Sequence, residues 1–114
     1  MSIIEEAYRA LWPDGHPWPA SGDCIEVPDG IAVLVGGYLE ALYVRPCSRN
    51  AGIARQLVEC VKEKARSRGI LRITADTWSD ERSAEGVLRA LGFEADAPRD
   101  GIDVALAMVL PWPR

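Results

Sequence analysis

Apolar residues recur every three or four positions in three segments of the chain, which is the spacing of an amphipathic helix. The first segment covers residues 3–11. The second covers residues 53–65 and ends before Gly69, a typical C-terminal stop. The third follows a possible cap at residues 79–80 and ends before Gly92. The pattern therefore predicts three helices.

Short apolar runs between these helices predict six strands. The expected strands are residues 24–27, 31–35, 38–44, 71–75, 93–95 and 104–110. The turn Pro28-Asp29-Gly30 joins the first two into a hairpin. The long helix connects the strands at 38–44 and 71–75, and such a right-handed crossover makes the two strands parallel. We therefore predict an α/β (α+β) fold, with a mixed, mainly antiparallel sheet, one parallel strand pair and helices on both faces.

Length and composition exclude several classes of protein. The chain has 114 residues, which is the size of one domain, so we expect residues 1–114 to form a single domain. Its net charge of −4 argues against general nucleic-acid binding. The longest apolar stretch, residues 31–39, is too short to span a membrane, and no signal segment opens the chain. We therefore expect a cytoplasmic protein with no nucleic-acid or membrane partner.

The metal-ligating residue types are few and scattered. Cys24, Cys47 and Cys60 have no paired spacing, and His16 is the sole histidine. Such a set favours reduced, unpaired thiols over a disulfide framework or a zinc site. We expect no metal cofactor.

Charge is unevenly distributed along the chain. Residues 45–72 contain eight basic and two acidic residues, a net charge of +6. The remainder contains five basic and fifteen acidic residues, a net charge of −10. The basic segment could favour an anionic ligand. Alternatively, its residues after Lys62 solvate the outer face of a helix.

The turn at residues 49–54, Arg-Asn-Ala-Gly-Ile-Ala, lies between a predicted strand and the long helix. At such a position the free N–H groups of a helix N-terminus can bind an anion, and small residues allow close approach. The turn lacks the Gly-Lys-Ser/Thr ending of the nucleotide-hydrolase loop and the three spaced glycines of the dinucleotide fingerprint. A tight start of the helix without a ligand is the alternative reading.

The segment Leu42-Tyr43-Val44-x-Pro46-x-x-Arg49-x-x-Gly52-x-Ala54 resembles the acetyl-CoA motif of the GNAT N-acetyltransferases. That motif reads Arg/Gln-x-x-Gly-x-Gly/Ala, and all three fixed positions are matched. Leu91-Gly92-Phe93 is similar to the Gly-Phe that follows a later helix of the family. The resemblance covers roughly residues 38–95.

A narrower resemblance points to the aminoglycoside 6′-N-acetyltransferases. The strand Tyr38-Leu39-Glu40-Ala41-Leu42-Tyr43-Val44 is similar to their Tyr-Leu-Glu-Gly-Ile-Tyr-Val. Ala75-Asp76-Thr77 and Ala90-Leu91-Gly92-Phe93-Glu94 follow in the same order. Residues 10–14 also resemble the first helix of that group.

The resemblance implies an enzyme that transfers an acetyl group from acetyl-CoA, its co-substrate, to a primary amine of a small cationic substrate. It implies that Glu40 and Asp76 are catalytic, holding the amine and helping to accept its proton. It also implies cofactor contacts by the strand and the turn: Leu42, Tyr43, Val44, Arg49, Asn50, Ala51, Gly52, Ile53, Ala54 and Arg55. The alternative for Glu40 and Asp76 is that both carboxylates face solvent.

Two features depart from the family pattern. Leu88 stands where many members have a tyrosine general acid. Only 37 residues precede Tyr38, so we expect the first strand and the second helix of the family to be absent, and the acceptor pocket to be open or completed in a homodimer. Two alternative functions stay open: a non-catalytic acyl-CoA-binding or interaction module, and an acetyltransferase acting on protein or peptide amines.

Overall fold

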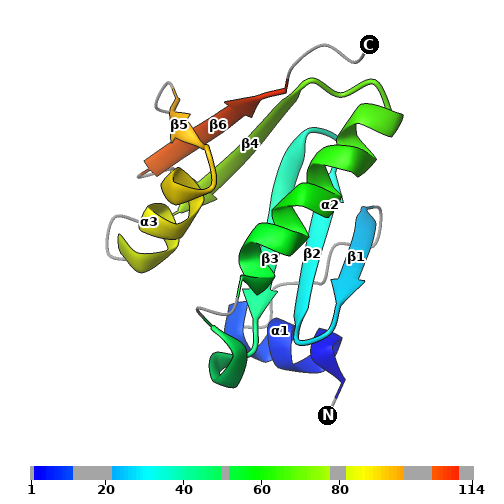
Figure 1. The fold of residues 1–114 in the computed structure, drawn as a ribbon, viewed down its shortest axis with the longest axis vertical. Helices are drawn as coiled ribbons and strands as arrows, with labels where there is room; N and C mark the ends of the chain where they lie inside the picture. The colour runs from blue at the N-terminus through cyan, green and yellow to red at the C-terminus, as the bar shows by residue number, and fades with distance from the viewer. Residues whose placement is uncertain (1, 12–21, 50–51, 78–81, 97–103, 111–114) are drawn as a thin grey trace.

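The computed structural model describes residues 2–11, 22–49, 52–77, 82–96 and 104–110. Three α-helices, a short 3-10 helix and six strands occur in these residues (Figure 1). In chain order they are α1 (Ile3–Leu11), β1 (Asp23–Val27), β2 (Gly30–Val35), β3 (Tyr38–Val44), η1 (Pro46–Ser48), α2 (Ile53–Ser67), β4 (Arg72–Thr77), α3 (Arg82–Ala90), β5 (Glu94–Ala95) and β6 (Val104–Val109). The structure does not describe the cap predicted at residues 79–80, His16, or the two Pro-Trp-Pro segments at residues 17–19 and 111–113.

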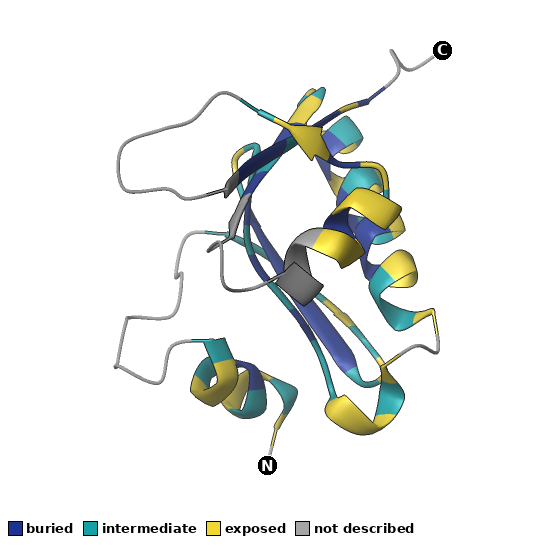
Figure 2. Ribbon diagram, turned by 90° about the vertical axis from the view of Figure 1, so that its left-hand side faces the viewer, coloured by how far each residue is buried: buried dark blue, intermediate teal, exposed yellow. Residues whose placement is uncertain are grey.

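The six strands form one sheet in the order β1-β2-β3-β4-β6-β5. The pair β3–β4 is parallel, and the other neighbouring strands are antiparallel. Helices α2 and α3 lie on one face of the sheet, and α1 lies on the other (Figure 2). The predicted fold class is therefore confirmed, including the parallel crossover through the long helix.

Both predicted glycine stops end their helices in the same way. Gly69 and Gly92 adopt left-handed φ values of 72° and 107°. After α2, the N–H of Ile70 donates to the carbonyl of Ala65, 2.8 Å away. After α3, the N–H of Phe93 donates to the carbonyl of Leu88, 3.0 Å away. These six-to-one hydrogen bonds satisfy carbonyls that the helix end leaves without partners.

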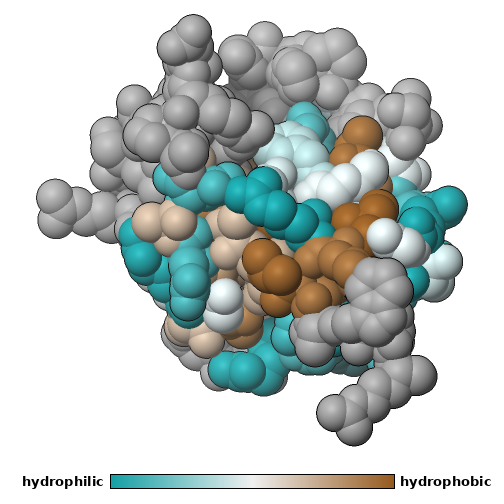
Figure 3. Space-filling model, turned by 90° about the horizontal axis from the view of Figure 1, so that it is seen from above, coloured by the Kyte–Doolittle hydropathy of each residue, from teal (hydrophilic) through white to brown (hydrophobic). Residues whose placement is uncertain are grey.

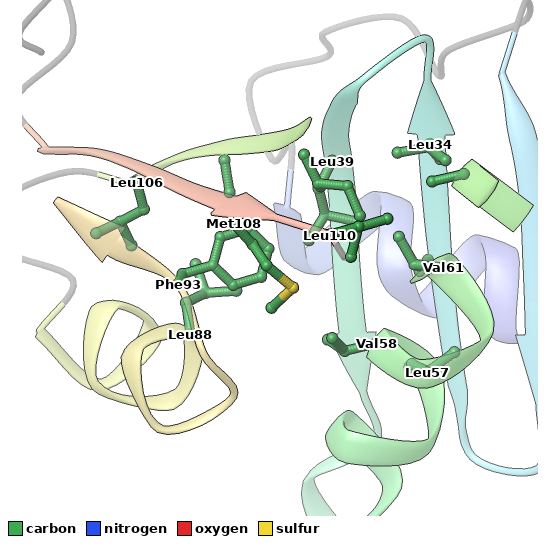
Figure 4. Packing of buried hydrophobic residues seen from close by; sticks show 14 residues of the cluster. Leu34, Leu39, Leu57, Val58, Val61, Leu88, Phe93, Leu106, Met108 and Leu110 are labelled. Carbon is green, nitrogen blue, oxygen red and sulfur yellow. The ribbon is translucent and has the colours of Figure 1, made fainter. Parts of the chain in front are cut away.

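The main hydrophobic core lies between the sheet and the two helices α2 and α3 (Figure 4). Its buried side chains from α2 include Leu57, Val58 and Val61. They share this core with Ile73 of β4 and Leu106 of β6, both fully buried. The buried stripe of α2 thus fixes the helix, and with it the position of its N-terminus, against the sheet.

A smaller core covers the opposite face of the sheet. There Ala7 of α1 packs with Ile31 of β2 and Tyr43 of β3, all three buried. Ile3 and Leu11 of α1 pack against this cluster. The amphipathic pattern at the start of the chain therefore serves to dock α1 on β2 and β3.

Ion pairs join elements at the surface. Arg68, after α2, contacts both carboxylate oxygens of Asp23 on β1, at 2.5 and 2.6 Å. The hydrogen bond from Arg68 lowers the pKa of Asp23. Arg72 of β4 similarly contacts Asp96 after β5. All three cysteines are unpaired, as the sequence predicted.

Figure 3 shows the end of the molecule at which α2 ends. Hydrophobic residues are exposed there among hydrophilic ones. Val109, the last residue of β6, is 73% exposed. Its side chain contributes little to the core, so it offers a reference for core substitutions.

We expect Leu57→Ala to lower the free energy of unfolding by about 2–5 kcal/mol, because it removes a fully buried side chain and leaves a cavity. Val109→Ala is the control, with an expected loss below about 1 kcal/mol. Urea titration followed by circular dichroism measures both. Equal losses would contradict the assignment of α2 to the core.

Candidate functional site

The strands β3 and β4 are paired only at their beginnings. In the described residues their parallel register consists of the pair Tyr38–Thr74. The N–H of Thr74 donates to the carbonyl of Gly37, 2.8 Å away. Beyond this pair the two strands diverge toward their C-terminal ends (Figure 1). We call the β4-facing side of β3 after Tyr38 the open edge of β3, because its peptide groups have no strand partner among the described residues.

Glycine at position 37 permits this junction. A Cβ atom there would lie 2.7 Å from the carbonyl oxygen of Arg72. That distance is too short for any side chain, and the obstacle is backbone of the neighbouring strand. The two strands can therefore meet here only because residue 37 is glycine and has no side chain.

A β-bulge lies next to this junction. Val33 is opposite Ala41 and Leu34 is opposite Leu39, so Glu40 is an extra residue on β3. Bulges bend a strand and change the direction of its side chains, and they are common beside active sites. Glu40 is half-buried at this position. The sequence pattern alone did not identify the bulge, although the spacing of three between the core-facing Leu39 and Leu42 was a signal for it.

The second predicted carboxylate residue lies on β4. Asp76 is two residues beyond Thr74, just as Glu40 is two residues beyond Tyr38. Its backbone is paired with Ala105 of β6. The strand runs from Arg72 to Thr77, so it begins one residue later and ends two residues later than predicted; pairing with β6 continues to Thr77.

The peptide groups of β3 alternate between its two neighbours. Arg45 N–H donates to the carbonyl of Asp29, 2.9 Å away, on the β2 side. Since successive peptide groups point to opposite sides of a strand, those of Leu42 and Val44 face the open edge. Those of Tyr43 face β2, and its side chain is buried against α1. Of the three predicted cofactor contacts on β3, Leu42 and Val44 thus offer backbone groups at the open edge.

The N-terminus of α2 follows directly after the end of β3. Gly52 caps the helix with a left-handed φ of 80°, and no side chain caps it. The N–H of Gln56 donates to the carbonyl of Gly52, 3.0 Å away, at the start of the helix. The N–H groups of Ile53, Ala54 and Arg55 are therefore unused by the helix. Apart from the glycine and its chain neighbours, no atom of the described residues lies within 4 Å of a Cβ built on Gly52. This open space and the free N–H groups fit an anion such as a pyrophosphate.

Two arginines lie beside this helix start. Arg49 is exposed, and its Nε donates to the carbonyl of Val44, 3.1 Å away. Arg55 is exposed on the first turn of α2, which contains no acidic residue. The remaining two predicted residues of the turn, Asn50 and Ala51, lie outside the described residues.

The positive charge available here is smaller than the net +6 of the segment. Four of its basic residues are held in ion pairs elsewhere: Arg45 with Glu6 and Asp29, Lys62 with Glu59, Arg68 with Asp23, and Arg72 with Asp96. Counting charges along the sequence did not reveal these pairs, because most partners are distant in the chain. The arrangement leaves Arg49 and Arg55 next to the free N–H groups.

The departure at Leu88 has a structural consequence. Leu88 of α3 is only 7% exposed and belongs to the main core with Phe93 and Met108 (Figure 4). It supplies no proton donor.

Two other features bear on the kind of site. Among the described residues, no group of three or more histidine, cysteine or acidic side chains could hold a metal ion. No described helix is both long and apolar enough to cross a membrane.

Comparisons with known proteins identify the family of the chain. Residues 32–93 match the model of the Acetyltransferase (GNAT) family. The chain is 33% identical over 116 aligned positions to an aminoglycoside N(6′)-acetyltransferase type 1 of Salmonella typhimurium, covering 75% of this chain and 79% of the relative.

Among solved structures, a Bacillus subtilis acetyltransferase in complex with CoA has a TM-score of 0.69 at 19% identity, covering 94% of this chain and 93% of that one. A Bacillus anthracis putative streptothricin acetyltransferase in complex with acetyl coenzyme A has a TM-score of 0.66 at 18% identity, covering 72% and 56%. These two similarities concern the fold. Together with the family match and the sequence relative, they show that the chain belongs to the GNAT family of acetyltransferases.

Proposed function

We propose that this acetyltransferase uses acetyl-CoA to acetylate a primary amine of a small cationic substrate, with aminoglycosides as the favoured class. The observation that carries the proposal is the juxtaposition of an anion-binding helix start at Gly52 with the open edge of β3. The relative named an aminoglycoside N(6′)-acetyltransferase supports the choice of acceptor.

Acetyl-CoA binding is assigned to two parts of the site. The pyrophosphate would accept hydrogen bonds from the N–H groups of residues 53–55, with Arg49 and Arg55 beside it. The pantetheine arm, which carries amide groups, would pair with the peptide groups of Leu42 and Val44 as an added strand would. Both assignments use groups that the fold leaves without strand or helix partners.

Acetyl transfer forms a bond between nitrogen and the acetyl carbon and breaks the bond between that carbon and sulfur. The attacking amine must be neutral, and it must lose a proton after attack. We assign Glu40 and Asp76 to holding the cationic substrate and receiving this proton, directly or through water. Two carboxylates also attract an ammonium substrate by their charge.

The thiolate of CoA leaves without a side-chain acid at position 88. The thiolate of a thiol whose unperturbed pKa is about 8.5 is a good leaving group, and water can protonate it. The burial of Leu88 in the core is therefore compatible with catalysis.

The proposal is tested by titrating acetyl-CoA and then measuring thiol release with aminoglycosides, polyamines and peptides. We expect saturable binding, and thiol release with at least one aminoglycoside. Binding without thiol release on any amine would favour the non-catalytic module, and release on peptides alone would favour a peptide amine acetyltransferase. Absence of acetyl-CoA binding would exclude all three functions.

Gly52→Ala is expected to raise the KM for acetyl-CoA about tenfold or more, because a methyl group would occupy the open space at the helix start. Gly36→Ala is a matched control, since Gly36 also has a positive φ of 57° and no atom within 4 Å of its Cβ position. Both variants should lose similar stability, but Gly36→Ala should keep the KM. Similar KM values for the two variants would rule out the assigned anion site.

Asp76→Asn and Glu40→Gln are expected to lower kcat/KM for the amine by about a hundredfold, the usual scale of lost acid–base catalysis. The KM for acetyl-CoA should change little, because neither residue belongs to the helix start. Steady-state kinetics with each substrate varied in turn measures both values. Unchanged turnover in either variant would exclude a catalytic role for that residue.

We also propose that the protein acts as a cytoplasmic homodimer in which a second copy closes the acceptor side. β1 is one of the two edge strands of the sheet in the described part of the chain, and its free edge supports such an association. Sedimentation at micromolar concentration should show a dimer, and a monomer would contradict the proposal.

A further inference from the structure

The segment between β3 and α2 is attached to a neighbouring turn by one carboxylate. Asp29 lies in the turn between β1 and β2, and it follows Pro28. Its Oδ1 accepts a hydrogen bond from Nη1 of Arg45, 3.0 Å away. Its Oδ2 accepts one from Oγ of Ser48, 2.8 Å away. Arg45 precedes η1 as its N-cap and Ser48 is the last residue of η1, so Asp29 contacts the segment at both ends of this turn.

The same residue also holds the segment through its backbone. The carbonyl of Asp29 accepts the hydrogen bond from Arg45 N–H, at 2.9 Å. Asp29 is the one non-glycine residue with a positive φ in the described part of the chain, at 66°. Aspartate and asparagine tolerate this conformation better than most residues, but it is still uncommon. Four features thus meet at one residue: three hydrogen bonds and a rare backbone conformation.

Arg45 extends this attachment to α1. Its Nε contacts Oε2 of Glu6, 2.6 Å away, while its Nη1 contacts Asp29. The Arg45 side chain is about 29% exposed. Hydrogen bonds from Ser48 and Arg45 hold the pKa of Asp29 below its usual value, so the carboxylate is charged at neutral pH.

The attached segment leads directly to the groups assigned to acetyl-CoA. Arg49 follows Ser48 in the chain, and its Nε donates to the carbonyl of Val44. Gly52 then begins α2. The direction of the segment at Ser48 therefore sets where Arg49 lies and how the chain reaches the free N–H groups of α2.

We propose that Asp29 is a positioning residue for acetyl-CoA binding: it holds the segment of residues 45–49 in the conformation that presents Arg49 and the start of α2 to the pyrophosphate. This inference rests on the proposed function, since it assumes that acetyl-CoA binds there. Without the attachment, the segment populates its binding-competent conformation less often. The apparent affinity falls by that fraction, while the chemical step is unaffected.

Positioning by Asp29 and direct repulsion by its charge predict opposite changes in CoA affinity. The carboxylate of Asp29 is negative, so by charge alone it would repel the phosphates of CoA. Removing its charge would then tighten binding. If Asp29 acts by positioning, removing its charge weakens binding instead.

The test compares Asp29→Asn and Ser48→Ala with the wild-type protein, using calorimetric titration of CoA and steady-state kinetics with acetyl-CoA varied. Asparagine tolerates the left-handed conformation but loses the charge that pairs with Arg45. We expect the Kd for CoA and the KM for acetyl-CoA to rise about three- to tenfold in Asp29→Asn and about threefold in Ser48→Ala. The kcat at saturating acetyl-CoA should stay at the wild-type value.

Asp23→Asn is the matched control. Asp23 lies on the same hairpin and forms a comparable pair with Arg68, but at the opposite end of α2. We expect it to lower stability without changing the KM for acetyl-CoA. Asp29→Gly supplies a second variant that keeps the backbone conformation if Asp29→Asn folds poorly.

The outcomes separate the two proposals. A wild-type protein that does not bind CoA contradicts the proposed function. Wild-type binding with an unchanged or lower Kd in Asp29→Asn overturns the positioning role alone. Equal losses of affinity in Asp29→Asn and Asp23→Asn would also overturn it, because they would reflect general destabilisation of the hairpin.

Discussion

The hydrogen bond from Thr74 N–H to the carbonyl of Gly37 determines how the two parts of the sheet meet. It holds β4 against the beginning of β3, and close backbone approach at Gly37 makes it possible. Because the described parallel pairing stops at Tyr38–Thr74, the peptide groups of the rest of β3 have no strand partner on one side among the described residues. The open edge is therefore a direct consequence of where strand pairing ends. Buried side chains such as Leu39 and Leu110 maintain the divergence by packing in the core shared by both parts (Figure 4).

The crossover through α2 places a helix N-terminus beside this open edge. The chain must return from the end of β3 to the beginning of β4, so α2 starts where β3 ends. Leu57, Val58 and Val61 fix the helix on the sheet, and its N-terminus then lies beside the open edge. Unused N–H groups and the positive end of the helix dipole occur together there. Neither property needs a particular side chain, and Gly52 keeps the space at the helix start open.

The sequence predicted the parts of the structure that depend on local patterns. Helical periodicity and glycine stops located α1, α2 and α3, and the hairpin turn at residues 28–30 located β1 and β2. The bulge at Glu40 was missed because it appears only when β3 is paired with β2. The contacts of Arg45 were also missed, since Glu6 is 39 residues away in the chain. Tertiary pairing decides both features, and the only local signal for either is the spacing of three between Leu39 and Leu42.

One side of the proposed site depends on backbone peptide groups, and the other depends on side chains. In the proposed assignment, peptide groups of Leu42, Val44 and the first turn of α2 form the cofactor side, which many sequences could build. The proposed acceptor side depends instead on the side chains at positions 40 and 76. Solved acetyltransferases at 18 and 19% identity share the fold, so the backbone itself tolerates wide sequence change. Under this proposal, a change of acceptor requires new side chains on the β3 bulge and on β4, while the backbone assigned to the cofactor stays in place.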